Sequence, residues 1–180
     1  MGNTLSGDQM LIRHMDDRDV EAVVDLALAN YDGVMARHHS AGILAGFRAD
    51  VTPQFFREQM RWKQVFVVEE SGELVATGAL ADSGTPDAPK HTVSQFYVRP
   101  DRHAQGIGAH LLTHLAHVAL DGGVEALHVP SSRNAIGFYQ RAGFTVDASQ
   151  PDAAIEMTWM TMPLRGSLRT RASSRPAPKA

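Results

Sequence analysis

The spacing of apolar residues in the first third of the chain predicts one strand followed by helices. Residues 10–15 have the mixed apolar pattern of a strand. Asp16 or Asp17 can cap the helix that follows. Apolar residues recur in it at helical spacing: Val20, Val23, Val24 and Ala27. Residues 38–46 are ambiguous, and we expect a short helix and a loop there. Thr52-Pro53 indicates another helix start, since a hydroxyl caps the first turn and proline suits the first helical position; we expect this helix to reach about Trp62.

Strand patterns dominate the middle of the chain. Residues 65–70 and 74–81 are two strand-like runs around Ser71-Gly72, which predicts a hairpin. Residues 82–90 are rich in Gly, Pro and Asp and are typical of a loop. Residues 92–98 form another strand-like run, which Pro100 ends.

The second half alternates helices and strands. Residues 106–120 are predicted to be helical, with one apolar stripe: Ile107, Leu111, Leu115 and Val118. We expect a strand over 124–129, a short helix over 134–142, and strands over 144–146 and 153–162. The resulting order, β-α-α-β-β-β-α-β-α-β-β, describes an α/β fold with a mixed sheet and helices on both faces.

Composition and charge narrow the class of protein. The 180 residues are 43% hydrophobic and 21% charged, which fits one globular domain over residues 10–164. We expect a flexible start over 1–9 and a disordered basic tail over 165–180. Five basic residues and no acid in that tail leave a net charge of −8 on the rest, which argues against nucleic acid and suits a cationic acceptor such as an amine. No apolar run has the length of a membrane helix, so we expect a cytoplasmic protein without a membrane partner. Cysteine is absent, so an acyl group cannot pass through a cysteine thioester.

A strand that leads through two glycines into a helix carries the most chemical information. Gly106 and Gly108 let backbone approach a ligand closely, and the first amides of a helix lack internal partners. The helix dipole favours an anion at the same place, so the turn predicts a phosphate site. Glycines that only shape a tight loop would give the same pattern in isolation.

A second segment downstream strengthens this interpretation. Val98-Arg99-Pro100 precedes residues 103–108, His-Ala-Gln-Gly-Ile-Gly, and Asn134-Ala135 precedes Phe138-Tyr139 and Gly143-Phe144. The two motifs in this order resemble the GCN5-related N-acetyltransferase (GNAT) superfamily over residues 10–163. The resemblance implies a mostly antiparallel sheet that splays at the cofactor site, with acetyl-CoA as co-substrate and an amine as acceptor. His103 departs from the family, which usually has Arg or Gln at this position.

The resemblance also implies roles for individual residues. Phe96, Tyr97 and Val98 would border the pantetheine arm of the coenzyme, and backbone amides near Val98 would polarise the thioester carbonyl. The pyrophosphate would be held by the amides of five consecutive residues: Gln105, Gly106, Ile107, Gly108 and Ala109. His103 would add a charge-assisted bond when protonated. Asn134 and Phe138 would lie beside the coenzyme. Tyr139 matches the usual general acid, which protonates the departing thiolate; the alternative is a core tyrosine whose hydroxyl is satisfied.

Several questions stay open at the level of sequence. The strand over 92–98 lacks the acidic residue that many relatives use as general base, and Asp82, His91, Ser94 or a water chain could serve. His38 and His39 are candidates for the acceptor pocket, although two loop histidines explain the pair somewhat better. His110, His114 and His117 share one helical face, and we expect packed or solvated histidines there and no metal site. Trp62, Trp159 and the Met-rich residues 157–162 suit a core or a dimer face, and homodimers are frequent among relatives.

These residues are compatible with three functions. The first is an acetyltransferase in which acetyl-CoA and an amine bind together and the neutral amine attacks the thioester directly. The second is a module of the same fold that binds acyl-CoA as a sensor without turnover, which the absent strand carboxylate and His103 favour. The third, a nucleotide-binding protein, lacks both a Gly-Lys-Ser/Thr sequence and an acid at the spacing of a dinucleotide fold.

Overall fold

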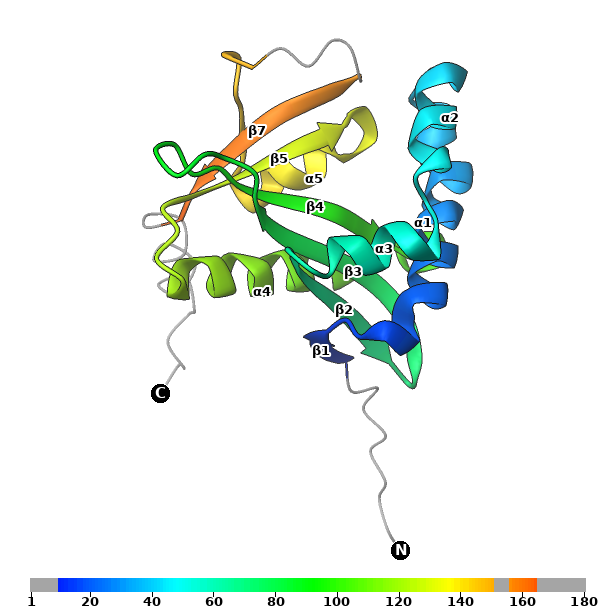
Figure 1. Ribbon diagram of the computed structural model, residues 1–180. Coiled ribbons are helices and arrows are strands. Elements are labelled where there is room, and N and C mark those ends of the chain that lie inside the picture. Colours follow the sequence, from blue (N-terminus) through cyan, green and yellow to red (C-terminus); the bar gives the residue numbers. More distant parts are fainter. Residues whose placement is uncertain (1–9, 151–155, 165–180) are drawn as a thin grey trace, which may run out of the picture.

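One seven-stranded sheet with helices on both faces makes up the computed structural model, which describes residues 10–150 and 156–164. The strand order is β1-β2-β3-β4-β5-β7-β6 (Figure 1). The strands are β1 (Met10–His14), β2 (Gln64–Glu70), β3 (Glu73–Asp82), β4 (His91–Val98), β5 (Ala126–Ser132), β6 (Thr145–Val146) and β7 (Met157–Pro163). The helices are α1 (Val20–Gly33), α2 (Ala41–Ala49), α3 (Pro53–Gln59), α4 (Ile107–Asp121) and α5 (Ile136–Ala142). Residues 1–9 and 165–180, predicted to be flexible or disordered, and residues 153–155 of the last predicted strand lie outside the described residues.

The sheet splays between its two central strands. β1 to β4 pair antiparallel with their neighbours, and β5 pairs antiparallel with β7 over its full length. β4 and β5 run parallel and pair only through Thr92 and His128. Beyond that pair the two strands diverge, so their facing backbone groups have no partners within the sheet. The predicted mixed, mostly antiparallel and splayed sheet is confirmed.

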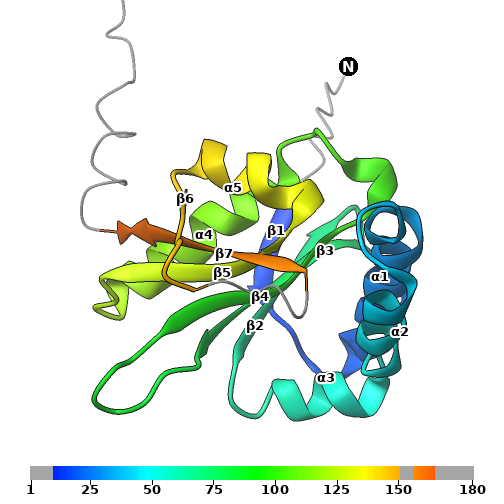
Figure 2. The ribbon, with the colours of Figure 1, turned by 90° about the horizontal axis from the view of Figure 1, so that it is seen from above.

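Two hydrophobic clusters fix the layers. One lies between the sheet and α4 with α5, and its fully buried members include Leu111, Leu115 and Phe144. The other lies between the opposite face and α1 with α3, and includes Val23, Phe56 and Val67. Figures 1 and 2 show α1, α2 and α3 grouped over one side of the sheet, with α4 and α5 on the other. Burial of alternate faces of β2 to β4 in different clusters is the period-two pattern expected of a covered sheet.

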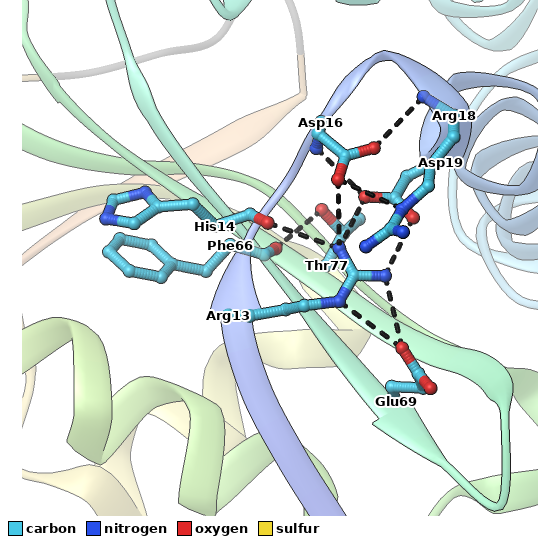
Figure 3. A network of polar contacts seen from close by, with 8 residues as sticks. All are labelled: Arg13, His14, Asp16, Arg18, Asp19, Phe66, Glu69 and Thr77. Carbon is cyan, nitrogen blue, oxygen red and sulfur yellow. Dashed lines mark hydrogen bonds and ion pairs between the residues drawn. The ribbon is translucent and has the colours of Figure 1, made fainter.

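Polar contacts anchor the start of α1 to the sheet edge (Figure 3). The side chain of Asp16 accepts from the amide of Arg18, and that of Asp19 accepts from the amide of Asp16, which forms a capping box. Arg13 on β1 donates to both carboxylate oxygens of Asp19, at 2.7 and 2.9 Å, and pairs with Glu69 of β2 at 3.1 Å. The network therefore joins two strands to the first helix. Asp16, one of the two residues that the sequence predicts as a cap, caps the 3-10 turn Asp17–Asp19 that leads directly into α1.

Some element boundaries differ from the sequence prediction. The ambiguous segment after α1 contains a 3-10 turn at Met35–Arg37 and then α2. α3 begins after a Thr52 cap as predicted but ends at Gln59, short of Trp62. β5 continues past its predicted end at 129 through Pro130 to Ser132. The strand tolerates this proline because β4 has already diverged at this point and does not pair with residue 130. In the described part of the chain, every helix is too short or too polar to cross a membrane.

Candidate functional site

The turn between β4 and α4 leaves a row of backbone amides without partners. After β4 the chain forms a 3-10 turn at Pro100–Arg102 and enters α4 at Gly106, whose φ of 84° lies in the left-handed region. The first helical bond runs from the amide of His110 to the carbonyl of Gly106, at 2.9 Å. Among the described residues, the amides of 105–109 donate to no protein group. Because the helix dipole adds partial positive charge here, this turn is a candidate anion site.

The two glycines of this turn serve different purposes. A Cβ on Gly106 would meet no atom within 4 Å, so the position opens onto free space, and its positive φ suits glycine alone. A Cβ on Gly108 would lie 3.3 Å from Cγ2 of Val98 and 3.4 Å from Cε2 of Phe138. Gly108 therefore lets α4 pack closely against the end of β4 and against α5, while Gly106 exposes the backbone.

A cavity of about 560 Å³ opens beside the turn, between the ends of α1, β4, α4 and α5. Ten of the eleven predicted cofactor-binding residues line it: Phe96, Tyr97, Val98, His103, Gly106, Ile107, Gly108, Ala109, Asn134 and Phe138. The eleventh, Gln105, is exposed, and its side-chain amide donates to the carbonyl of Asp101 at 3.5 Å. The structure thus brings both sequence motifs to one cavity.

Tyr139 lies behind this lining, in an aromatic cluster. Its ring centroid is 5.0 Å from that of Phe138, 5.4 Å from Phe144 and 6.2 Å from Phe96, and the residue is 4% exposed. Burial raises the pKa of its hydroxyl well above the ordinary value, so the group stays protonated. Among the described residues the hydroxyl has no hydrogen-bond partner. The ring therefore packs as a core tyrosine would, while its hydroxyl has no protein partner within the described chain.

The carbonyl of Val98 fixes His103 in place. It accepts from the side-chain amide of Asn30 at 3.0 Å and contacts Nε2 of His103 at 2.9 Å. Because a carbonyl only accepts, Nε2 carries the proton in this contact. The second nitrogen, Nδ1, can donate to a ligand only in the doubly protonated imidazolium.

Several lining residues were not predicted from the sequence. They include Asn30, Arg102, Ser132 and Arg141. Asn30 occupies the buried face of α1, where its side-chain amide also donates to the carbonyl of Leu26 at 2.9 Å. The sequence contains one signal for Asn30, because a polar residue within a helical apolar stripe indicates a buried polar contact. Arg102 and Arg141 add positive charge near the anion site, although Arg102 is already paired with Glu70 at 3.0 Å.

The candidate bases, and His39 of the predicted acceptor pocket, lie in different surroundings. Asp82 accepts from the amides of Gly84 and Lys90 in the loop before β4, and these bonds lower its pKa. Ser94 accepts from Nζ of Lys63 at 3.1 Å. His39 is buried, with Nδ1 3.5 Å from Glu156, and burial lowers its pKa. None of these three residues lines the cavity, and neither does His91.

Beside these candidates, β4 carries a bulge. Thr77 pairs with Tyr97 and Ala79 with Ser94, so Gln95 and Phe96 both lie opposite Gly78. Gln95 has a φ of 49°, and both terminal atoms of its side chain are buried without partners in the described structure. The bulge distorts β4 just after it leaves β5.

Comparison with known proteins agrees with this geometry. A family model described as an acetyltransferase (GNAT) domain matches residues 28–164. The PaiA N-acetyltransferase of Thermoplasma acidophilum, solved with coenzyme A, has a TM-score of 0.73 at 16% identity over 86% of this chain and 99% of that one. A GCN5-related N-acetyltransferase of Rhodopseudomonas palustris has a TM-score of 0.70 at 21% identity, over 91% and 100%.

A predicted acetyltransferase of Clostridium acetobutylicum, solved with acetyl-CoA, has a TM-score of 0.65 at 17% identity, over 82% of this chain and 97% of that one. At these identities the likeness concerns the fold. No curated protein sequence matches the chain significantly. The family match covers most of the chain and both motifs of the cavity, and the chain therefore belongs to the acetyltransferase (GNAT) domain family.

Proposed function

We propose that the protein transfers an acetyl group from acetyl-CoA to a primary amine, of a small molecule or of a protein, by direct attack in a ternary complex. One observation carries the proposal: the unpaired amides of residues 105–109 lie at the rim of a cavity that the diverging strand β4 also borders. Coenzyme A has a diphosphate and a long arm with amide groups, and these two features match the two parts of the site.

Each part of the coenzyme has a complementary surface. The diphosphate would accept from the amides of 105–109, and Arg102 and Arg141 add charge nearby. The pantetheine arm would lie along Phe96, Tyr97 and Val98, where β4 has lost β5 as a partner and its edge can bond to a ligand as to another strand. Asn134 and Phe138 would close the other side. Free amides on the same edge of β4 would polarise the thioester carbonyl and stabilise the developing oxyanion.

Tyr139 would protonate the sulfur as it leaves. Its phenol stays protonated in the aromatic cluster. A phenol with a raised pKa is a weak acid, but the same apolar surroundings destabilise a thiolate and raise the pKa of the thiol that forms. Proton transfer is therefore less uphill in the cluster than water values suggest, and it accompanies breakage of the carbon–sulfur bond.

The solved relatives support the choice of co-substrate. The Thermoplasma acidophilum protein holds coenzyme A and the Clostridium acetobutylicum protein holds acetyl-CoA, each on the fold shared with this chain. The homodimer and the cytoplasmic location stay predictions from sequence.

Calorimetry with two ligands tests the proposal. Acetyl-CoA is expected to bind, whereas acetyl-pantetheine, which has the same arm without the diphosphate, is expected to bind at least tenfold more weakly. Release of free thiol across a panel of primary amines then tests turnover. Equal affinity for the two ligands, or no binding of acetyl-CoA, would contradict the proposal.

The sensor function stays a second candidate. It is favoured by one observation: none of the candidate bases Asp82, His91 and Ser94 lines the cavity. Binding of acetyl-CoA without thiol release from any amine would support the sensor.

A further inference from the structure

Lys63 holds an ammonium group in a partly buried position without a carboxylate. The residue lies between α3 and β2, with Nζ 4.7 Å from the ring centroid of Trp62 and 3.1 Å from Oγ of Ser94. Within residues 10–150 and 156–164, no acidic side chain pairs with it, and loss of hydration is the sole cause that lowers its pKa. A partly dehydrated cation without a counter-charge is a place where an anion binds favourably.

Lys63 and Ser94 together have more free donors than free acceptors. Nζ carries three protons, one of which is donated to Oγ of Ser94. Because that oxygen accepts from Lys63, its own proton is left to donate, and the described residues give it no acceptor. Two N–H groups and one O–H group are therefore free to bind a group that only accepts, and a carboxylate is such a group.

The pair lies where β4 and β5 part, on the face opposite α4. Ser94 pairs with Ala79, which is buried in the cluster under α1 and α3, so Ser94 faces the same side. It is the first residue of β4 on this face beyond Thr92, which makes the last contact with β5. Phe96, two residues further along β4, lines the cavity on the α4 side. Lys63 and Ser94 therefore lie on the face of the sheet opposite α4, next to the point where β4 and β5 diverge.

The neighbouring surface on β5 and β7 contains a second lysine beside a tryptophan. Nζ of Lys90 lies 3.5 Å from the ring centroid of Trp159 on β7, and His128 of β5 lies close enough for Lys90 to help lower its pKa, after the larger effect of burial. Asp147 is the acid nearest His128, and its carboxylate already accepts from Ser149 and Gln150. This face therefore carries a second ammonium group, that of Lys90.

We propose that the acceptor is an amino acid or a similar amine with a carboxylate, and that Nζ of Lys63 and the hydroxyl of Ser94 bind this carboxylate. The inference rests on the proposed acetyl transfer and names its substrate class. Lys63 positions the acceptor: its ammonium group binds the carboxylate and leaves the amine free to attack. The acidic net charge of the chain favours the amine, while this local site selects amines that also carry an anion.

Matched acceptors test the assignment. The probes are the L-amino acids and their carboxamides, which keep the amine and the side chain and lose the negative charge. In Lys63→Met, kcat/KM for the amino acids that the wild type acetylates is expected to fall at least tenfold, through KM, while kcat/KM for the carboxamides changes less than twofold. Lys63→Arg, which keeps the charge, is expected to retain most activity. Lys90→Met is the control for a second lysine that lies over a tryptophan on this face, and should affect neither set more than threefold.

Three outcomes would overturn the inference. One is acetylation of amines with no preference for carboxylates and no effect of Lys63→Met, which would leave the acetyltransferase proposal intact. Another is an equal loss of kcat for amino acids and carboxamides in Lys63→Met, which would make Lys63 a base. The third is an enzyme that binds acetyl-CoA but acetylates no amino acid. Failure of acetyl-CoA to bind would instead contradict the proposed function itself.

Discussion

At the scale of single residues, the hydroxyl of Tyr139 is distinguished by the lack of a protein hydrogen-bond partner among the described residues. The ring packs among Phe96, Phe138 and Phe144, but the hydroxyl contributes no hydrogen bond within the described protein. A tyrosine in this cluster therefore gains no protein hydrogen bond that a phenylalanine would lack, which leaves its hydroxyl available for chemistry.

Tyr139→Phe separates the enzyme from the sensor. We expect kcat to fall about 100-fold, because the proton for the leaving thiolate is lost. The affinity for acetyl-CoA in calorimetry should stay within about threefold, and the free energy of unfolding should change by less than about 1 kcal/mol, since no hydrogen bond is removed. An unchanged kcat would exclude Tyr139 as the acid.

A second prediction at this scale concerns the effect of Lys63 on the stability of the fold. Burial lowers its pKa from 10.5 to about 8, so the folded state binds this proton less tightly than the unfolded state. The penalty is complete below pH 8 and disappears as the pH rises past 10.5. We expect Lys63→Met to be more stable than the wild type by roughly 1 kcal/mol at pH 7, a figure reduced from the full shift because the group is partly exposed.

Urea unfolding at several pH values measures this difference. It should shrink between pH 8 and pH 10.5 as the wild-type lysine loses its proton. Lys63→Arg keeps the charge and should show no gain at pH 7. A constant difference across this range would mean that Lys63 is well hydrated, and the anion site would lose its physical basis.

At the scale of elements, the turn into α4 depends on two glycines with separable tasks. Gly106 and Gly72 have nearly the same backbone, with φ of 84° and 82°, and in both a Cβ would meet nothing within 4 Å. Gly72 lies in the β2–β3 hairpin, away from the cavity lining. A substitution at Gly72 therefore measures the cost of backbone strain alone, whereas the same substitution at Gly106 also tests whether a side chain obstructs the ligand.

Gly106→Ala and Gly72→Ala should lower the free energy of unfolding by similar amounts, about 1 kcal/mol each, through the cost of a positive φ. Only Gly106→Ala should weaken the binding of acetyl-CoA, by about tenfold or more, because the added methyl group would lie between the diphosphate and the amides. Calorimetry and thermal unfolding measure both effects. Equal affinity in the two variants would place the diphosphate elsewhere.

The elements that could be predicted from the sequence are those with local causes. The apolar stripe of α4, the Thr52 cap and the hairpin at Ser71-Gly72 each depend on residues a few positions apart, and each prediction is confirmed. The turn at Gly106 was visible for the same reason. The prediction ended β5 too early, at residue 129. A proline ends a strand only where the neighbouring strand needs a hydrogen bond from that position, and this cannot be seen in the sequence.

The contacts that shape the site could not be predicted in this way. Asn30 donates to Val98 across 68 positions, Lys63 to Ser94 across 31, and Ser40 to Glu156 across 116. No local period encodes such pairs, since they depend on how the helices cover the sheet. The resemblance to the family indicated the coenzyme motifs but gave no position for the residues that we propose to face an acceptor, Lys63 after α3 and Ser94 on β4.

At the scale of the whole molecule, the N-terminal edge is held by charge as well as by packing. Arg13 joins β1 to Asp19 at the start of α1 and to Glu69 on β2 (Figure 3). The side chain of Asp19 is 6% exposed, so this carboxylate depends on Arg13 for compensation. β1 has only β2 as a neighbour in the sheet, and the ion pairs tie it to the helix layer as well.

Arg13→Met should therefore destabilise the entire fold. The hydrogen bond from Arg13 is the main reason that the pKa of Asp19 is lowered. The stability that this pair supplies is present above the pKa of an unfolded aspartate and is lost as the pH falls through the lower folded value. We expect a loss of about 3 kcal/mol at pH 7 from an uncompensated buried carboxylate, and a smaller loss below about pH 4, where Asp19 takes up a proton in the variant.

Arg18→Met provides the matched control for this prediction. Arg18 also pairs with an aspartate, Asp16 at 3.0 Å, but its side chain is 73% exposed, so its removal should cost less than about 0.5 kcal/mol. Urea unfolding followed by circular dichroism and by tryptophan fluorescence measures whether β1 and the rest of the sheet unfold together. Coincident transitions at a lower midpoint in Arg13→Met would show that the network stabilises the whole domain, whereas an early transition in one probe alone would confine its effect to the edge.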